Sequence, residues 1–173
     1  IREKLNHLEQ IAGRILDFGK SREAFRKTFS LEEIVKDAAL LVRLKLEQCQ
    51  VSLHINELSH DLFVFVDKGQ IQQALLNLML NALVAMPNGG ELEIEVSKTG
   101  EAKAQILVKD TGSGILAELQ DKIFDSFLTG TTEGTGLGLS ISKRILRAHD
   151  GNLDLLESGS QGTVFKITLP LAI

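Results

Sequence analysis

A helix that is apolar on nearly every side is the feature that most constrains this chain. The run "GQIQQALLNLMLNALVAM", residues 69–86, predicts that helix, with Asp67 placed as its N-cap. Among its few polar residues, Gln73, Asn77 and Asn81 recur every four residues and therefore share one face. A helix that is hydrophobic all round is buried, so these amides need polar partners.

Two interpretations of this polar line stay open from the residues alone. Asparagines can pair within a core, because a buried amide left unpaired costs about 1–3 kcal/mol. Alternatively, amide oxygens one turn apart form a wall that suits a hard cation such as Mg²⁺, which also takes phosphate oxygens and water as ligands.

Charge and composition argue against several classes of function. The 173 residues carry a net charge of −4 and contain no Trp or Tyr, which disfavours a general nucleic-acid surface and a stacking platform for single strands. The single cysteine, Cys49, excludes a disulfide framework within the chain and favours a reducing, cytoplasmic compartment. No uninterrupted apolar stretch approaches about 18 residues, so we expect no membrane contact.

Residues 1–29 carry a helical pattern of their own. Apolar residues in steps of four and three form the seam of a coiled coil or helix bundle: Ile1, Leu5, Leu8, Ala12 and Ile15. A lone helix would leave that seam exposed, so we expect a partner helix, which a second copy of the chain can supply. The chain opens inside this pattern without an initiator Met, and we read it as a piece of a longer protein.

A second unit is expected over residues 30–173. Ser30 and Glu33 form a capping-box pattern ahead of an amphipathic helix over 31–48, and "GLGLSISKRILRAHDG" predicts a helix closed by Gly151. About five strands accompany these helices, in a mixed order with hairpin-like pairs and no run of right-handed crossovers. We therefore expect an α+β fold, a two-layer sandwich in which helices cover one face of a mixed sheet.

The stretch "DTGSGI", residues 110–115, places an acid and two glycines directly after the strand-like run "AQILVK". Asp110 can be a metal ligand, a catalytic base, a ribose contact or only a turn former. Gly112, Gly114 and Ala117 also fit the dinucleotide pattern G-x-G-x-x-A. That alternative is disfavoured, because the preceding strand is the second arm of a hairpin and no long helix follows.

A second glycine-rich stretch, "GTTEGTGLGLSISKRIL", runs directly into a helix. Gly134, Gly136 and Gly138 alternate there, and backbone N–H groups at such a helix start form an anion site. No Gly-Lys-Ser/Thr follows, so the stretch is not a Walker A loop. We expect it to bind phosphate.

In this order, four stretches between about residues 31 and 170 resemble the ATP-binding catalytic domain of sensor histidine kinases, in the GHKL superfamily with its Bergerat-type sandwich. "NLMLNALVAM" is similar to the N box, "DTGSGI" to the G1 box, "IFDSFLTG" to the F box and "GTGLGLSISKRI" to the G2 box. The first 29 residues resemble the second helix of the kinase's dimerisation and phosphotransfer bundle. The resemblance thus implies a bundle helix over 1–29 and an ATP domain over 30–173.

The same resemblance implies ATP and Mg²⁺ as ligands. Asn81 would supply the metal ligand, Asp110 would accept a hydrogen bond from the adenine 6-amino group, and Thr163 would assist at the adenine edge. The nucleotide-binding residues that it implies are Asn77, Asn81, Asp110, Gly112, Gly114, Ile115, Phe127, Thr135, Gly136, Leu137, Gly138, Leu139 and Thr163. Phe124 would join Phe127 as an F-box aromatic.

The activity implied is transfer of the ATP γ-phosphate to a histidine and then to an aspartate of a response regulator, in a homodimer joined by the bundle. Asn77 stands where hydrolysing relatives carry a glutamate base, which favours transfer to a protein side chain. The chain lacks the acceptor-histidine helix, so we expect no autophosphorylation of this piece. No basic residue follows Asn81 closely, which leaves Lys143 or Arg144 as candidates for the phosphates. The alternatives are an anti-sigma-factor-type serine kinase of the same fold and a non-catalytic nucleotide-binding scaffold.

Overall fold

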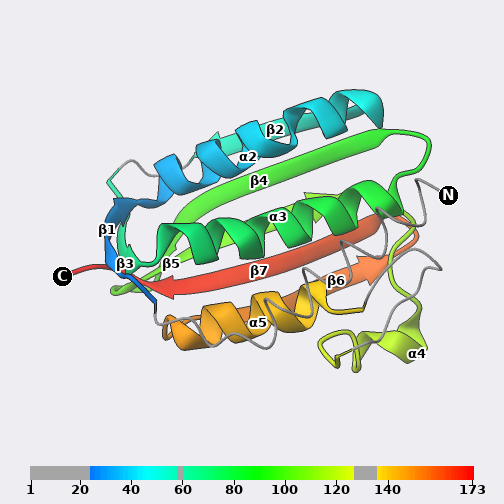
Figure 1. Cartoon of the computed structure of the whole chain (residues 1–173). Coiled ribbons are helices and arrows are strands. Elements are labelled where there is room, and N and C mark those ends of the chain that lie inside the picture. The colour runs from blue at the N-terminus through cyan, green and yellow to red at the C-terminus, as the bar shows by residue number, and fades with distance from the viewer. Residues whose placement is uncertain (1–23, 58–60, 127–135) are drawn as a thin grey trace, which may run out of the picture.

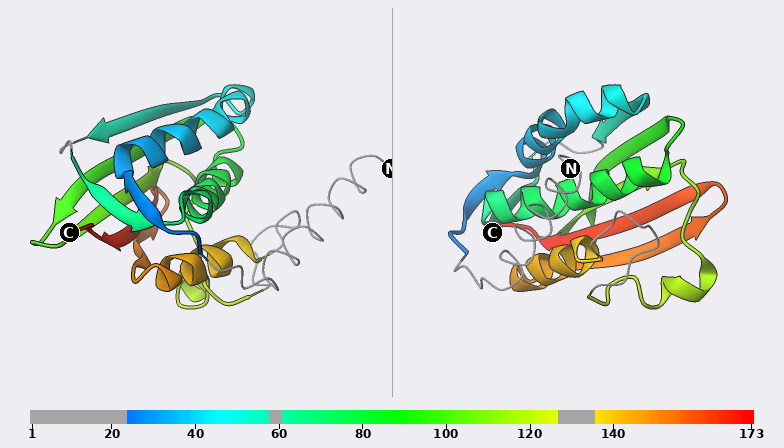
Figure 2. Two further views of the ribbon diagram at one scale, coloured as in Figure 1. Left: turned by 60° about the vertical axis from the view of Figure 1, so that its left-hand side comes forward. Right: turned by 45° about the vertical axis from the view of Figure 1, so that its right-hand side comes forward.

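The computed structural model describes residues 24–57, 61–126 and 136–173. In this part of the chain, a five-stranded sheet forms one layer, and helices packed on one of its faces form the other (Figures 1 and 2). The helices of that layer are α2 (Leu31–Gln48), α3 (Lys68–Ala85) and α5 (Gly138–Ala148). The strands are β2 (Val51–Glu57), β4 (Gly90–Thr99), β5 (Lys103–Asp110), β6 (Asn152–Gly159) and β7 (Gly162–Pro170). The predicted α+β class, with helices on one face of a mixed sheet, is confirmed.

The sheet has the strand order β2-β4-β5-β7-β6. β2 runs parallel to β4, and the other neighbouring pairs are antiparallel. The predicted hairpin of "ELEIEV" and "AQILVK" is the pair of β4 and β5, in which Ile94 lies opposite Val108. Both are buried, because alternate residues of each strand face the helical layer.

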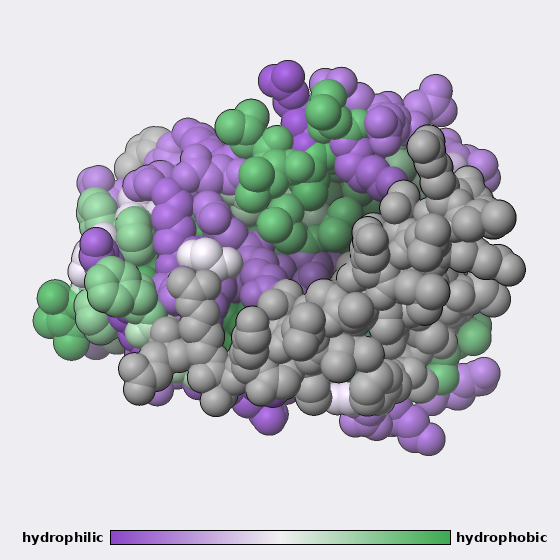
Figure 3. Space-filling model, in the orientation of Figure 1, coloured by the Kyte–Doolittle hydropathy of each residue, from purple (hydrophilic) through white to green (hydrophobic). Residues whose placement is uncertain are grey.

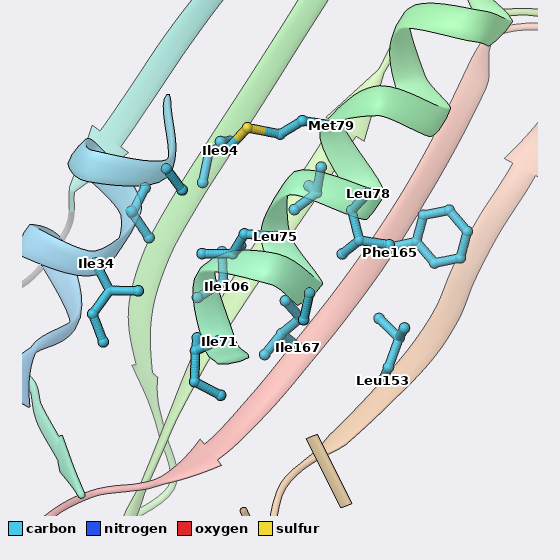
Figure 4. Close-up of a cluster of buried hydrophobic side chains, with 14 of the residues drawn as sticks. Ile34, Ile71, Leu75, Leu78, Met79, Ile94, Ile106, Leu153, Phe165 and Ile167 are labelled. Atoms are coloured by element: carbon cyan, nitrogen blue, oxygen red, sulfur yellow. The ribbon is translucent and has the colours of Figure 1, made fainter. Parts of the chain in front are cut away.

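The central position of α3 explains its apolar circumference. This helix packs between α2 and α5 and also lies over the sheet, so three of its sides are covered (Figure 1). Ile71, Leu75 and Leu78 of α3 are buried together with Ile106 and Ile167 of the sheet (Figure 4). Each buried side chain of this size contributes about 1.5–3 kcal/mol, so this cluster is a main source of stability.

A separate two-stranded antiparallel sheet is formed by β1 (Lys27–Ser30) and β3 (Phe63–Val66). The prediction of a helix as far as residue 29 is therefore wrong at its end, and its first part lies outside the described residues. The predicted capping box is also wrong: Ser30, as the last residue of β1, makes no side-chain bond to α2. Asp67 is confirmed as a cap, since its Oδ1 accepts from the N–H of Gln70 at 3.1 Å.

The helical layer exposes an apolar patch over α2 and α3, which is green in Figure 3. Leu40, Leu41 and Leu44 of α2 are 65%, 66% and 69% exposed, and Val84 of α3 is 57% exposed. Despite this patch, none of the helices in the described ranges is both long and apolar enough to cross a membrane.

Candidate nucleotide-binding site

The polar line of α3 divides into two environments. Asn77 is half-buried, and its Nδ2 donates to the carbonyl of Gly138 and to Oγ of Ser142, each at 3.2 Å. Asn81, one turn later, is exposed to solvent. The first amide nitrogen is thus satisfied within the fold and holds α3 against α5, whereas the second amide is accessible to a ligand.

The glycine-rich stretch leads into α5 without a side-chain cap. Gly136 has φ +68°, which favours glycine, and Leu137 occupies the N-cap position ahead of Gly138. The leucine side chain cannot accept from the N–H groups of the first turn, and the structure shows no side-chain cap bond there. A helix start of this kind suits an anion, because the N–H groups of its first turn need acceptors from elsewhere.

The remaining residues of the predicted set are placed only in part. Leu139 and Ile115 are half-buried and pack against the core. Thr135 and Phe127 lie outside the described residues.

Asp110 is the last residue of β5 and lies opposite Thr163 of β7. Its carboxylate accepts from the backbone N–H of Gly112 at 2.8 Å and from that of Thr163. Burial raises the pKa of Asp110 above its ordinary value, and the two N–H donors oppose the rise. Asp110 and Thr163 both line a hollow of about 280 Å³ at the end of the β6–β7 hairpin. A ligand entering it meets a preformed acceptor.

The glycines of "DTGSGI" are required by close packing. A Cβ on Gly112 would lie 2.6 Å from Cβ of Ala85, at the end of α3. Gly114 has φ +77°, and a Cβ on it would lie 2.1 Å from the carbonyl oxygen of Gly159. The turn is therefore held between α3 and the β6–β7 hairpin. The helix that follows, α4 (Ala117–Gln120), has only four residues. The dinucleotide pattern requires a long helix after the glycines, so this short helix agrees with the rejection of that alternative.

Two residues that the sequence did not reveal complete this end of the site. Oγ of Ser158, in β6, accepts from the N–H of Ile115 at 2.8 Å and lies 2.9 Å from Oγ1 of Thr163. Nε2 of Gln120 donates to the carbonyl of Ile115 at 2.9 Å and to that of Ser158 at 3.4 Å. Together these bonds fasten the glycine turn to the hairpin that carries Thr163.

Residues 66–173 match the family described as "Histidine kinase-, DNA gyrase B-, and HSP90-like ATPase", which is more than half of the chain. The chain belongs to this ATPase family. It is 31% identical to the signal transduction histidine-protein kinase AtoS of Escherichia coli K12, over 98% of this chain and 28% of AtoS. The chain therefore spans less than a third of that curated relative.

Two solved members of the family have an architecture similar to that of this chain. Histidine kinase ThkA, in complex with the response regulator protein TrrA, is 30% identical with a TM-score of 0.83, over 99% of this chain and 49% of the ThkA chain. Full-length ShkA, in complex with AMPPNP, is 25% identical with a TM-score of 0.87, over 99% of this chain and 37% of the ShkA chain. The sandwich described above is thus the fold of histidine kinase catalytic domains.

Phe124 belongs to the segment whose sequence resembles the F box of sensor histidine kinases. Its ring meets that of Phe165 edge-on, with centroids 6.5 Å apart and an interplanar angle of 70°. Nζ of Lys143 lies 4.2 Å from the Phe124 centroid and donates to the carbonyl of Leu153 at 2.9 Å. Burial, helped by the charge of Arg147, lowers the pKa of Lys143. The ammonium that the sequence offered to the phosphates is therefore bound to the F-box ring and β6.

The donors for a metal in this family member are sparse. Within the described ranges, no group of three or more His, Cys, Asp or Glu residues can hold a metal ion. Asn81 offers an exposed amide oxygen, a neutral hard ligand that suits Mg²⁺ when phosphates and water fill the other positions. These residues suit an Mg²⁺ ion that enters together with a nucleotide, and they suit a permanently bound ion less well.

Proposed function

We propose that this chain is the ATP- and Mg²⁺-binding catalytic piece of a sensor histidine kinase. The observation that carries the proposal is the pairing of Asp110 with Thr163 beside a close-packed glycine turn. In our assignment the ionised Asp110 accepts from the adenine 6-amino group, and the turn lets the backbone approach the base and sugar.

The phosphates in this proposal lie at the start of α5. Backbone N–H groups after Gly136 bind them, and the bonds from Asn77 to Gly138 and Ser142 hold that helix start beside α3. A Mg²⁺ ion held by Asn81 would neutralise charge on the phosphates when bound. The role of the protein is then to position the γ-phosphate. Positioning, together with charge neutralisation, accounts for most of the catalysis in phosphoryl transfer.

Transfer to a protein side chain, and not hydrolysis, is the reaction that we propose. Asn77 occupies the position at which a general base would activate water, and a carboxamide does not take up a proton at neutral pH. Its Nδ2 is also committed to α5.

The acceptor that we propose is a histidine on a helix bundle of the longer protein, followed by an aspartate of a response regulator. The likeness to ThkA, solved in complex with TrrA, supports such a partner. The apolar seam of residues 1–29 supports their assignment to the second bundle helix of a homodimer, with residues 30–173 as the ATP domain. We place the reaction in the cytoplasm.

Titration calorimetry with ATP, together with an assay for phosphate release, tests this function. The chain should bind ATP more tightly with Mg²⁺ than with a chelator, and it should not release inorganic phosphate over many binding lifetimes. Absence of ATP binding would favour the non-catalytic scaffold. Steady phosphate release would favour a hydrolase, and stable phosphorylation of a histidine in this chain would contradict our account of it as lacking the acceptor.

A further inference from the structure

We propose that Ser158 is a positioning residue for base recognition and makes the site select adenine over 6-oxopurines. This inference rests on the proposed ATP site and adds to it a residue that reaches the base through another side chain. Ser158 is half-buried near the end of β6, directly opposite Thr163 of β7. Thr163 is itself opposite Asp110 of β5, so the three residues form a row across neighbouring strands.

A β-bulge brings Ser158 into this row. Leu153 and Leu155 lie opposite the core residues of β7, but the register shifts between Leu155 and Glu157. Without that shift, strict alternation would place Glu157 on the helical side and Ser158 on the open side of the sheet. The bulge reverses the two and points the serine at Thr163, which is how bulges next to binding sites redirect a side chain.

The hydrogen bonds of Ser158 decide which way the hydroxyl of Thr163 points. The N–H of Ile115 can only donate, so Oγ of Ser158 is an acceptor in that bond. The proton of the serine hydroxyl is then available for its other neighbour, Oγ1 of Thr163 at 2.9 Å. Among the described residues, Oγ of Ser158 has no third partner that could accept this proton. Either hydroxyl can donate in the contact between Ser158 and Thr163. In our assignment Ser158 donates, and the proton of Thr163 remains for a ligand.

The result is a donor beside an acceptor at the edge of the hollow. Thr163 presents a hydroxyl proton, and Asp110 presents a carboxylate whose position is fixed by the N–H groups of Gly112 and Thr163. Adenine offers the complementary pair, a 6-amino donor beside the N1 acceptor. A 6-oxopurine offers the reverse, an oxygen acceptor beside an N1–H donor, and would leave both protein groups unpaired.

Titration of the intact chain with ATP and with inosine triphosphate tests the inference, because these nucleotides differ only at that edge. The wild type should prefer ATP by about 100-fold or more, since a site built for hydrogen bonds rejects an analogue that cannot make them. Ser158→Ala frees the Thr163 hydroxyl to rotate and should reduce the ratio of the two affinities by about 10-fold. Ser158→Thr keeps a hydroxyl and should restore the ratio.

Gln120→Ala is the matched control, because it removes bonds to Ile115 and Ser158 from the same turn without touching Thr163. It should leave the ratio unchanged, even if both affinities fall. If Ser158→Ala lowers both affinities equally, Ser158 only fastens the turn and the inference is wrong. Should that variant fail to fold, Ser158→Cys decides, since a thiol is a weak donor and must reduce the ratio, and an unchanged ratio would contradict the inference. A wild-type chain that binds neither nucleotide would instead contradict the proposed function.

Discussion

The two ends of the proposed nucleotide site are built differently. At the base end, Asp110, Thr163 and Ser158 come from three neighbouring strands and are hydrogen-bonded to one another or to the glycine turn. At the phosphate end, Asn81 is exposed on α3, and α5 starts without a side-chain cap. Within the described ranges, the base end is held by hydrogen bonds inside the protein, whereas the phosphate end offers a helix start and the exposed amide of Asn81.

This difference indicates a division of roles. An end whose polar groups are held in place by hydrogen bonds can discriminate between bases, because a wrong base leaves those groups without a partner. At the phosphate end the described residues fix few side chains, so in our proposal the metal that accompanies the ligand supplies the charge neutralisation there. We therefore expect base recognition to be a property of the protein, and phosphate binding to depend on Mg²⁺.

The largest expected effect comes from removing a glycine at the base end. Gly162 has φ +126°, and an added Cβ would lie 1.8 Å from the carbonyl oxygen of Asp110. Gly162→Ala should therefore lower the free energy of unfolding by about 2–4 kcal/mol in urea denaturation. Gly100→Ala is the control: it has φ +66° but no atom within 4 Å, and it should cost only about 1 kcal/mol. Equal losses would show that the close packing at Gly162 is unimportant.

Replacing the carboxylate that we assign to the adenine should have the next largest effect. Asp110→Asn places an amide where two backbone N–H groups already donate, so it should lower the affinity for ATP by about 10–100-fold in calorimetry. Asp154→Asn, in the same sheet but bonded to Asn152, should bind ATP as the wild type does. If Asp110→Asn binds ATP as tightly as the wild type does, the assignment of Asp110 to the adenine is wrong.

Alanine variants of the two asparagines of α3 should differ in their effects, one on the dependence of ATP binding on Mg²⁺ and the other on stability. Asn81→Ala removes an exposed amide and should change the free energy of unfolding by less than about 0.5 kcal/mol, while abolishing the effect of Mg²⁺ on ATP affinity. Asn77→Ala removes two bonds to α5 and should cost about 1–2 kcal/mol of stability in denaturant titrations. A persistent Mg²⁺ effect in Asn81→Ala would contradict its role as a ligand.

The smallest effect near neutral pH concerns the protonation of Asp110. Burial raises the pKa of Asp110 in the folded protein, so the folded chain binds this proton more tightly than the unfolded chain does. The free energy of unfolding that Asp110 contributes therefore increases as the pH falls toward 3.8, the ordinary pKa of an aspartate. The adenine amino group needs the carboxylate, so ATP affinity should fall over the same window, by at most about tenfold per pH unit. Calorimetry from pH 7 downward measures this fall, and the difference in unfolding free energy between wild type and Asp110→Asn should move in the opposite direction. Affinity that rises on acidification would contradict the assignment.

Local patterns predicted much of the fold. The apolar circumference of α3 followed from its position between two helices and a sheet, the cap at Asp67 was confirmed, and the alternation of β4 and β5 gave the hairpin. Errors came where tertiary pairing decided the conformation. Lys27–Ser30 forms a strand because β3 is available to pair with it, which the helical pattern before it did not indicate.

The glycine turn that begins at Asp110 was predictable from its own residues, whereas contacts with partners that are remote in the sequence were not. Asp110 and the glycines around it are marked by the turn that they form. Ser158 could not be identified, because a bulge reverses the face on which it lies. Lys143 was a candidate for the phosphates by charge alone, but its ammonium is held by the carbonyl of Leu153 and the ring of Phe124, contacts that depend on how α5 packs.

The central claim is that the base end discriminates by itself and that Mg²⁺ acts only at the phosphate end. The most direct test is calorimetry of the wild-type chain with ATP and with inosine triphosphate, each with Mg²⁺ and with a chelator. Our account predicts that chelation weakens both nucleotides and leaves the ratio of their affinities unchanged. A ratio that collapses toward one when Mg²⁺ is removed would contradict it.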